Sequence, residues 1–246
     1  MSSFQKAKKK FLIIFDFDGT VIDKDSEDEL LKKIFSKEDY NKVMSQLNIL
    51  EFFDGFNYYF RLMKKRGLTL KDINSILDKI ELSPKMFELL KYLRENKYKF
   101  KIIICSVGID YSIKYILNRY GFLDLFDEFI CTKGNVQSEK SDRLIEVPNN
   151  QFPHDCENCY EWQCKSHELN KFLEKNKKFE KILFVCDGSN DYCPTEKILK
   201  QGDIVFPRKG QKLHNMLLSD DTLNKLTCEI CPWEKADEII FKLKGL

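Results

Sequence analysis

Short apolar runs alternate with amphipathic stretches along most of this chain. The runs have the length of single buried strands and lie at residues 11–15, 100–105 and 181–186, and more weakly at 126–131 and 204–206. Between most of them, apolar residues recur at helical spacing, as at 86–93, 111–119 and 166–176. This alternation predicts an α/β fold with a Rossmann-like parallel sheet flanked by helices.

Residues 24–83 interrupt the alternation. The apolar residues at 30–35 and 52–63 follow helical spacing with no strand between them, which predicts a small helical cap inserted after the first strand. We therefore expect a catalytic core made of residues 1–23 and 84–246, with the cap between its two parts.

Local signals add detail to this outline. Ser83 and Pro84 predict an N-cap followed by the first residue of a helix, and Pro194 predicts the start of another. The aromatic residues at 52–60 either pack inside the cap or line a substrate pocket. Residues 134–164 are polar and irregular, which is typical of a functional or partly disordered loop.

Composition excludes several classes of protein. The 41 basic and 39 acidic residues nearly cancel to a net charge of +2, which argues against a dedicated nucleic-acid binder. No apolar stretch approaches the roughly 18 residues of a membrane span. Residues 6–15 have the charge order of a signal peptide, but the apolar run stops at Asp16 without a cleavage site. We expect a cytoplasmic protein without nucleic-acid or membrane partners, whose oligomeric state the sequence does not indicate.

Polar side chains follow the apolar runs. Asp16 and Asp18 follow the first run and point to the same side, because a strand alternates its side chains. Ser106 follows the second run, and Asp187 and Asp191 follow the third. The carboxyl ends of parallel strands meet at one edge of a sheet, so we expect these groups to converge there.

Four carboxylates at one edge need a cation, because burying unpaired acids is costly. Hard oxygen ligands of this kind suit Mg²⁺, which takes one or two carboxylates together with waters and a phosphate oxygen. Gly19 and Gly108 would let the backbone approach a phosphate closely, and Gly19 and Thr20 open a turn after the acids. The pattern predicts a magnesium and phosphate site that still needs a lysine.

Four motifs in order resemble the haloacid dehalogenase superfamily: Asp16-x-Asp18-Gly-Thr, then Ser106, then Lys165, then Asp187-Gly-x-x-Asp191. A closer resemblance is to the phosphoethanolamine/phosphocholine and pyridoxal-phosphate phosphatase family. It is carried by residues 187–194 and 206–210 and by the run His154-Asp-Cys156-Glu-Asn-Cys159-Tyr-Glu-Trp-Gln-Cys164-Lys165. The resemblance spans residues 11 to about 210 and implies a Mg²⁺-dependent hydrolase of small phosphate esters.

The resemblance implies a role for each motif. Asp16 is expected to be the nucleophile that forms an aspartyl-phosphate, and Asp18 the general acid and base. Ser106 and Lys165 are expected to bind the phosphoryl oxygens. The expected Mg²⁺ ligands are the Asp16 carboxylate, the Asp18 main-chain oxygen, Asp187 and, directly or through water, Asp191. Taken singly, Ser106 is typical of a turn, Lys165 of a surface and Asp191 of a helix cap.

Substrate recognition is where this chain departs from the family pattern. The serine of the second motif is typically followed by aspartate in the family, but here Val107 follows it, and Cys186 replaces a glycine. The local sequence looks more like phosphoserine-phosphatase-like or methylthio-ketopentenyl-phosphate-phosphatase-like relatives, which are the alternative substrate types. Glu27 matches a second recognition acid, and the expected substrate-binding residues are Glu27, Gly19, Thr20, Ser106 and Gly108.

The nine cysteines are an odd number in a chain too long for a disulfide scaffold. His154, Cys156, Cys159 and Cys164 have the spacing of a zinc site, to which a second pair at residues 228 and 231 could add ligands. We favour the interpretation that reduced cysteines pack this loop and position Lys165. A zinc-stabilised, non-catalytic interaction module is the alternative from a different class, and the intact set Asp16, Asp18, Ser106, Lys165 and Asp187 argues against it.

Overall fold

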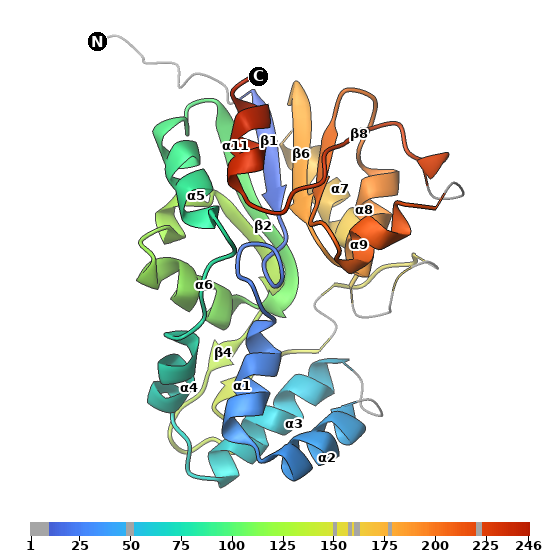
Figure 1. The fold of residues 1–246 in the computed structure, drawn as a ribbon. Coiled ribbons are helices and arrows are strands. Elements are labelled where there is room, and N and C mark those ends of the chain that lie inside the picture. Colours follow the sequence, from blue (N-terminus) through green and yellow to red (C-terminus); the bar gives the residue numbers. More distant parts are fainter. Residues whose placement is uncertain are drawn as a thin grey trace.

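The computed structural model describes residues 10–47, 52–149, 152–156, 159, 163–176, 179–219 and 223–246. Its centre is a parallel sheet with the strand order β3-β2-β1-β6-β7-β8 (Figure 1). In this order the strands are Glu128–Thr132, Phe100–Ile109, Phe11–Phe15, Lys181–Cys186, Ile204–Pro207 and Glu229–Ile230. The structure confirms the Rossmann-like α/β sheet that the apolar runs predict.

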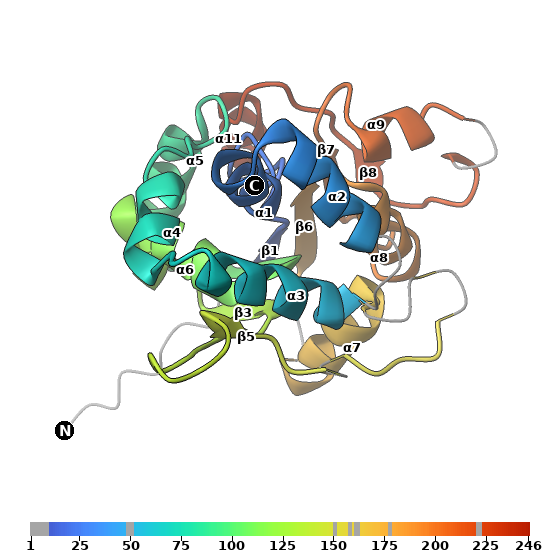
Figure 2. The same cartoon turned by 90° about the horizontal axis from the view of Figure 1, so that it is seen from below.

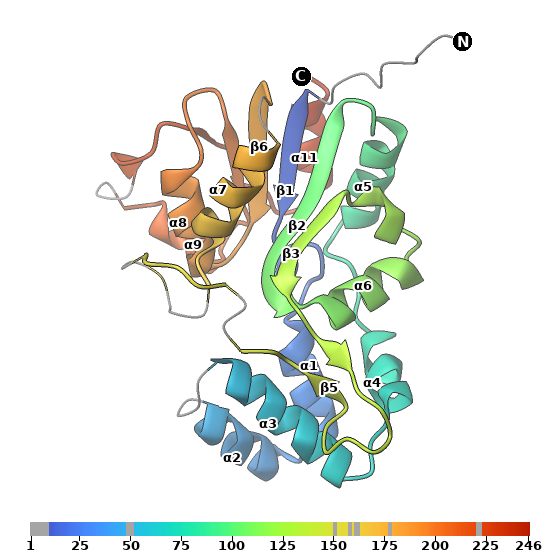
Figure 3. The ribbon, with the colours of Figure 1, turned by 180° about the vertical axis from the view of Figure 1, so that it is seen from behind.

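Two layers of helices cover the two faces of the sheet (Figure 3). One layer holds α5 (Met86–Glu95), α6 (Asp110–Arg119) and α11 (Asp237–Leu243); the other holds α7 (Lys165–Lys175), α8 (Tyr192–Lys197) and α9 (Lys212–Met216).

The central strand β1 packs against both layers. Ile13 and Phe15 belong to one buried cluster, whereas Leu12 and Ile14 belong to the other, and all four are inaccessible to solvent. Burying one such side chain stabilises the fold by roughly 1.5–3 kcal/mol. The strand is therefore held firmly on both faces up to the point where Asp16 follows it.

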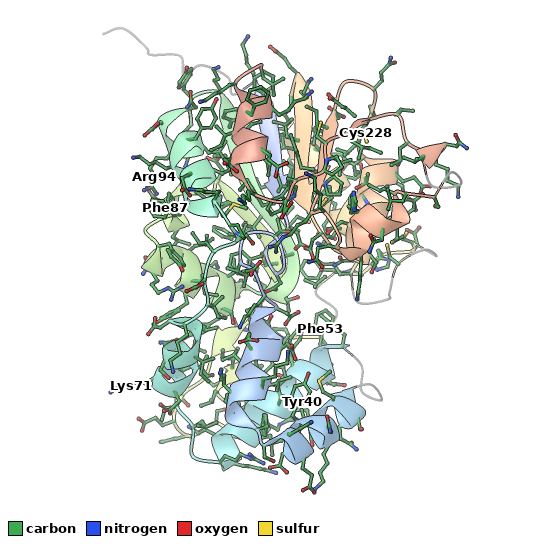
Figure 4. All side chains as sticks on the ribbon, in the orientation of Figure 1. Tyr40, Phe53, Lys71, Phe87, Arg94 and Cys228 are labelled. Carbon is green, nitrogen blue, oxygen red and sulfur yellow. The ribbon has the colours of Figure 1, made fainter. Side chains whose placement is uncertain are left out.

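A second body of helices lies beyond the carboxyl ends of the strands (Figures 1 and 2). It contains α1 (Ser26–Ile34), α2 (Lys37–Leu47), α3 (Phe52–Lys65) and α4 (Leu70–Leu77), all within the range expected for the cap. Tyr40 on α2 donates to Asp28 Oδ1 on α1 at 2.6 Å, which ties two of these helices together (Figure 4). The domain boundaries at residues 23 and 84 stay a prediction.

A short antiparallel hairpin packs against this helical body. It consists of β4 (Asn135–Val136) and β5 (Ile145–Glu146), inside the stretch expected to be irregular. Asn57 on α3 donates from Nδ2 to the Val147 carbonyl at 2.7 Å and accepts the Val147 N–H at 2.9 Å. The long loop thus carries structure of its own and connects the sheet with α3.

Two predicted helix starts are wrong by two residues. The helix expected at Pro84 begins at Met86, after Lys85 in a left-handed conformation with φ of 64°. The Ser83 N–H donates to the Val21 carbonyl at 3.0 Å, and this pairing holds Ser83 and Pro84 outside the helix. The helix expected at Pro194 begins earlier, at Tyr192. Within the described parts of the chain, every helix is too short or too polar to cross a membrane.

Candidate active site

Three carboxylates meet at the carboxyl end of the central strands. Asp16 and Asp187 follow β1 and β6, which are parallel neighbours in register, so both acids emerge on the same edge. Asp191 returns to this edge from the turn after β6 and is fully buried. One carboxylate oxygen from each acid lies within 4.8 Å of the others. The convergence expected from the strand ends is therefore present in the structure.

A buried lysine bridges two of these carboxylates. Lys165 is the first residue of α7, and its Nζ lies 2.9 Å from Asp16 Oδ2 and 2.6 Å from Asp191 Oδ1. Burial by itself would lower the pKa of Lys165, but Asp16 and Asp191 outweigh burial and hold this pKa well above its ordinary value. The lysine therefore places a permanent positive charge beside Asp16, where phosphoryl oxygens would need one.

One lysine does not neutralise three carboxylates. Burial first, and then the charge of Asp16, raise the pKa of Asp187 to about 6 and the pKa of Asp191 to about 8. A bound divalent cation would offset the repulsion between these buried negative charges.

The oxygen atoms around Asp187 are of the kind that binds Mg²⁺. Thr20 donates from Oγ1 to Asp187 Oδ1 at 2.8 Å. Gly19 has a φ of 70°, and a Cβ atom at this position would lie 2.4 Å from Asp187 Oδ2. Only glycine leaves space here, and the oxygen atoms gathered around it are the hard ligands that Mg²⁺ prefers.

Asp18 has a different environment from the three clustered acids. Its Oδ1 accepts the N–H of Ser26 at 2.8 Å. Burial first, then the nearby charges of Glu27 and Asp25, raise the pKa of Asp18 well above its ordinary value. A carboxyl group whose protonated form is favoured in this way is suited to protonate a leaving alcohol.

The end of β2 brings the second motif next to Asp18. The pairing of β2 with β3 is irregular between Cys105 and Ile109, so this segment departs from a regular strand. A Cβ atom on Gly108 would lie 2.8 Å from Asp18 Oδ2. The Gly108 N–H donates to Ser106 Oγ at 3.1 Å, and Ser106 is buried at the wall of the cavity described below.

Glu27 links the cap to the core. Its Oε1 accepts the Ile109 N–H at 3.2 Å, and its Oε2 accepts from Ser26 Oγ at 2.8 Å. Burial first, and then Asp25, raise the pKa of Glu27 to about 7. Each carboxylate oxygen has a partner within the protein, and the expected part of Glu27 in substrate binding stays a prediction.

A cavity of about 930 Å³ opens onto the acids between the core and the cap. Phe52 of α3 reaches it from the cap, whereas the other aromatic residues of the stripe are buried (Phe53, Tyr59 and Phe60) or partly buried (Phe56 and Tyr58). The core contributes the predicted residues Asp16, Asp18, Ser106, Lys165 and Asp187, as well as Val107. Among the described lining residues, the expected substrate-binding residues Gly19, Thr20, Glu27 and Gly108 do not appear.

Sequence reasoning missed two residues at the site. Gln163 lines the cavity with 6% of its surface exposed, and in the described part of the chain neither side-chain polar atom has a hydrogen-bond partner. Arg208 donates from Nη1 to the Gly19 carbonyl at 2.7 Å and also contacts Asp23, which holds the turn after β1. Both residues belong to segments that carry the family resemblance, Arg208 to residues 206–210 and Gln163 to residues 154–165, but the sequence motifs indicated no role for either of them.

The cysteines of the long loop lie beside this site. Cys156, Cys159 and Cys164 gather with Cys193, a residue absent from the predicted zinc set, and not with His154. The His154 Nδ1 instead accepts the N–H of Cys156 at 3.1 Å. Cys193 is far away in sequence, and only the packing of α7 against α8 brings it to the other three.

Comparisons with known proteins agree with this geometry. The family model described as Putative Phosphatase matches residues 11–246. A phosphoethanolamine/phosphocholine phosphatase from Gallus gallus is 29% identical over 255 residues, which cover 96% of this chain and 89% of the relative. The pyridoxal phosphate phosphatase PHOSPHO2 of Mus musculus is 28% identical over 242 residues, which cover 96% of this chain and 98% of the relative.

Solved structures share the fold. A phosphoserine phosphatase in its apo form superposes with a TM-score of 0.59 at 20% identity, covering 95% of this chain and 98% of that one. A phospho-aspartyl intermediate analogue of phosphoserine phosphatase superposes with a TM-score of 0.57 at 20% identity, covering 96% of this chain and 99% of that chain. The chain belongs to the Putative Phosphatase family, whose members are phosphoric monoester hydrolases of the haloacid dehalogenase superfamily.

Proposed function

We propose that this phosphatase hydrolyses a small phosphomonoester in two displacements, with Asp16 as the nucleophile and Mg²⁺ as the cofactor. The observation that carries the proposal is the buried Lys165, whose ammonium group lies between the Asp16 and Asp191 carboxylates. It orients Asp16 and supplies charge for the phosphoryl oxygens, which fits covalent catalysis at this carboxylate.

In the first displacement, an Asp16 oxygen attacks phosphorus, and the bond from phosphorus to the ester oxygen breaks. The carboxyl proton of Asp18 moves to the leaving oxygen, so an alcohol departs and a phosphoryl group stays on Asp16. The raised pKa of Asp18 supports this role, because burial and the nearby charges of Glu27 and Asp25 favour the protonated carboxyl group. Ser106 and Lys165 both line the cavity and would bind the phosphoryl oxygens.

In the second displacement, Asp18 is a carboxylate and accepts a proton from water. The water oxygen attacks phosphorus, the bond to Asp16 breaks, and inorganic phosphate leaves. Asp18 ends the cycle protonated, as it began. The cap over the cavity limits access to bulk water during both steps.

The carboxylates of Asp16, Asp187 and Asp191 and the Asp18 main-chain oxygen would hold the metal. When bound, Mg²⁺ neutralises charge on the nucleophile and the phosphate, so that one anion can approach another. Lys165 already pairs with Asp191, which favours contact of Asp191 with the metal through water.

The substrate class we propose is a small phosphate ester of the phosphoethanolamine, phosphocholine or pyridoxal phosphate type. Two relatives named for such substrates align over 96% of this chain. The cavity is large enough for any of the three, because small-ligand sites are typically a few hundred Å³ or more. Val107 and Gln163 line it and are the side chains by which this chain would distinguish leaving groups.

A panel of small phosphate esters tests the proposal. Phosphoethanolamine, phosphocholine, pyridoxal phosphate and phosphoserine are compared by phosphate release with and without Mg²⁺. We expect Mg²⁺-dependent release from one of the first three, and none from Asp16→Asn. Absence of release from every ester and from an aryl phosphate would contradict the proposed activity, and preferred release from phosphoserine would contradict the proposed substrate class.

A binding experiment tests the metal separately from turnover. Mg²⁺ should raise the free energy of unfolding of the wild type by about 2.7 kcal/mol at one hundred times its dissociation constant. Asp187→Asn removes a ligand and should remove this increase. An equal increase in the variant would contradict the role of Asp187 as a ligand.

A further inference from the structure

We propose that Cys156, Cys159, Cys164 and Cys193 bind one structural Zn²⁺ ion through their thiolates. One Sγ atom from each residue lies within 4.8 Å of the other three. The proposed ion is separate from the Mg²⁺ at the carboxylates, and the inference does not depend on the reaction at Asp16.

The separations between the sulfur atoms match a tetrahedral zinc site. Cys193 Sγ lies 3.9 Å from Cys156 Sγ and 3.8 Å from Cys164 Sγ. Four sulfurs bound at about 2.3 Å to a tetrahedral Zn²⁺ are themselves about 3.8 Å apart. The observed distances are far longer than the roughly 2.05 Å of a disulfide bond. The sulfur atoms therefore surround a space the size of one ion.

A cation and a hydroxyl group lie beside the sulfur atoms. Lys197 Nζ lies 3.2 Å from Cys156 Sγ and offsets part of the negative charge of a four-thiolate site. Ser166 Oγ lies 2.9 Å from Cys164 Sγ and 3.0 Å from Cys193 Sγ, within hydrogen-bond distance of both sulfurs. Groups of this kind fix the orientation of metal ligands.

Burial and chain spacing also suit a structural metal. Cys164 and Cys193 are 1% and 6% exposed, and Cys156 and Cys159 are partly buried. Cys156 and Cys159 form a Cys-x-x-Cys pair, and the other two ligands come from the start of α7 and the first turn of α8. Four protein ligands close the coordination sphere, as in zinc sites that stabilise structure and perform no chemistry.

The ion would position the catalytic charges. Cys164 directly precedes Lys165, and Cys193 comes two residues after Asp191. A metal bound to both cysteines links the start of α7 to the start of α8, and these two segments carry the ion pair between Lys165 and Asp191. The zinc is thus a positioning element for the active site and does not touch the substrate.

Metal analysis of the full-length protein tests the inference. We expect about one zinc ion per chain by mass spectrometry of protein purified without metal-affinity resin, in the wild type and in Asp16→Asn. Asp16→Asn lacks the proposed nucleophile, so its zinc content separates failure of this inference from failure of the phosphatase proposal. Protein with four reactive thiols and no zinc would overturn the inference, as would one iron ion per chain.

Substitutions of the ligands provide the second test. Cys159→Ser and Cys193→Ser should lose the zinc. Cys228→Ser should keep it, because Cys228 (labelled in Figure 4) directly precedes β8 and is not a member of the group of four cysteines. If the ligand variants fail to fold, the wild type is loaded with Co²⁺ in place of zinc. Four thiolates should then give sulfur-to-cobalt charge-transfer absorption and tetrahedral ligand-field bands, and a spectrum of oxygen-bound cobalt would overturn the inference.

The positioning role has its own measurement. Removing zinc with a chelator in excess Mg²⁺ should lower kcat at least tenfold with a smaller change in KM, and adding back zinc should restore kcat. An unchanged kcat in protein shown to be zinc-free would overturn the positioning role.

Discussion

Lys165 and Asp191 form a 2.6 Å ion pair in which neither side chain is more than 1% exposed. The pair joins the first residue of α7 to the turn after β6, and the second contact of Lys165, to Asp16, extends it to β1. Three segments distant in sequence therefore meet at one ammonium group. A buried charge of this kind stabilises the fold only while its partners are present.

Lys165→Met should impair both activity and stability. The substitution leaves Asp16 and Asp191 buried without their cation, so the free energy of unfolding should fall by about 3–5 kcal/mol. Loss of the charge that binds phosphoryl oxygens should lower kcat by about 10²–10³-fold. Urea denaturation and phosphate release measure the two effects.

The matched variant Lys171→Met removes an exposed lysine from the same helix and should change stability by no more than about 0.5 kcal/mol. A Lys165→Met variant with wild-type kcat would contradict this assignment.

Gly108→Ala should damage proton transfer by Asp18. The new Cβ atom would lie 2.8 Å from Asp18 Oδ2, so the carboxyl group must move away from the leaving oxygen. A displacement near 1 Å can lower a rate by about 10²-fold. The loss should be greater for an alkyl phosphate than for an aryl phosphate, because an alkoxide leaves poorly without a proton.

The control for this variant is Gly245→Ala, where the added Cβ atom meets nothing nearer than the Lys242 carbonyl at 3.5 Å. It should have wild-type rates on both esters. Equal losses on both esters in Gly108→Ala would argue that the substitution acts on something other than Asp18.

The sequence predicts well where the acids at the strand ends lie, because buried parallel strands and the acids after them are local signals. Asp16 and Asp187 are found where the apolar runs end, and β1 and β6 place them side by side. The start of α5 was wrong because Ser83 pairs with Val21, a contact between distant residues that overrides the local N-cap pattern. Cys193 was missed as a neighbour of the loop cysteines for the same reason, since tertiary packing brings it there.

Glu27 should make stability depend on pH. Its pKa rises from the usual 4.5 to about 7 in the folded protein, so the folded state holds a proton that the unfolded chain has lost. The free energy of unfolding should therefore fall as the pH rises from about 4.5 through about 7. The side chain of Glu27→Gln cannot ionise, so the variant should lack this fall. Its free energy of unfolding relative to that of the wild type should increase by about 1–3 kcal/mol from pH 5 to pH 8.

Denaturation at these two pH values checks the prediction. Glu29→Gln is the matched control, because it removes a carboxylate on the same helix that pairs with Lys24 at 3.1 Å. It should shift stability by a similar amount at both pH values. A pH-independent effect of Glu27→Gln would show that Glu27 does not carry a raised pKa.

Gln163→Leu should separate substrate binding from stability. The Gln163 amide lines the cavity and is 6% exposed, and it has no hydrogen-bond partner in the described part of the chain. Removing a buried polar group without a partner should leave the free energy of unfolding unchanged or raise it by about 1 kcal/mol. If the amide forms a hydrogen bond with the leaving group of the substrate, the same change should raise KM about tenfold, which corresponds to the loss of one hydrogen bond.

Gln211→Leu, at another position in the cavity wall, controls for loss of a lining amide. Wild-type KM together with higher stability in Gln163→Leu would assign this amide no part in recognition.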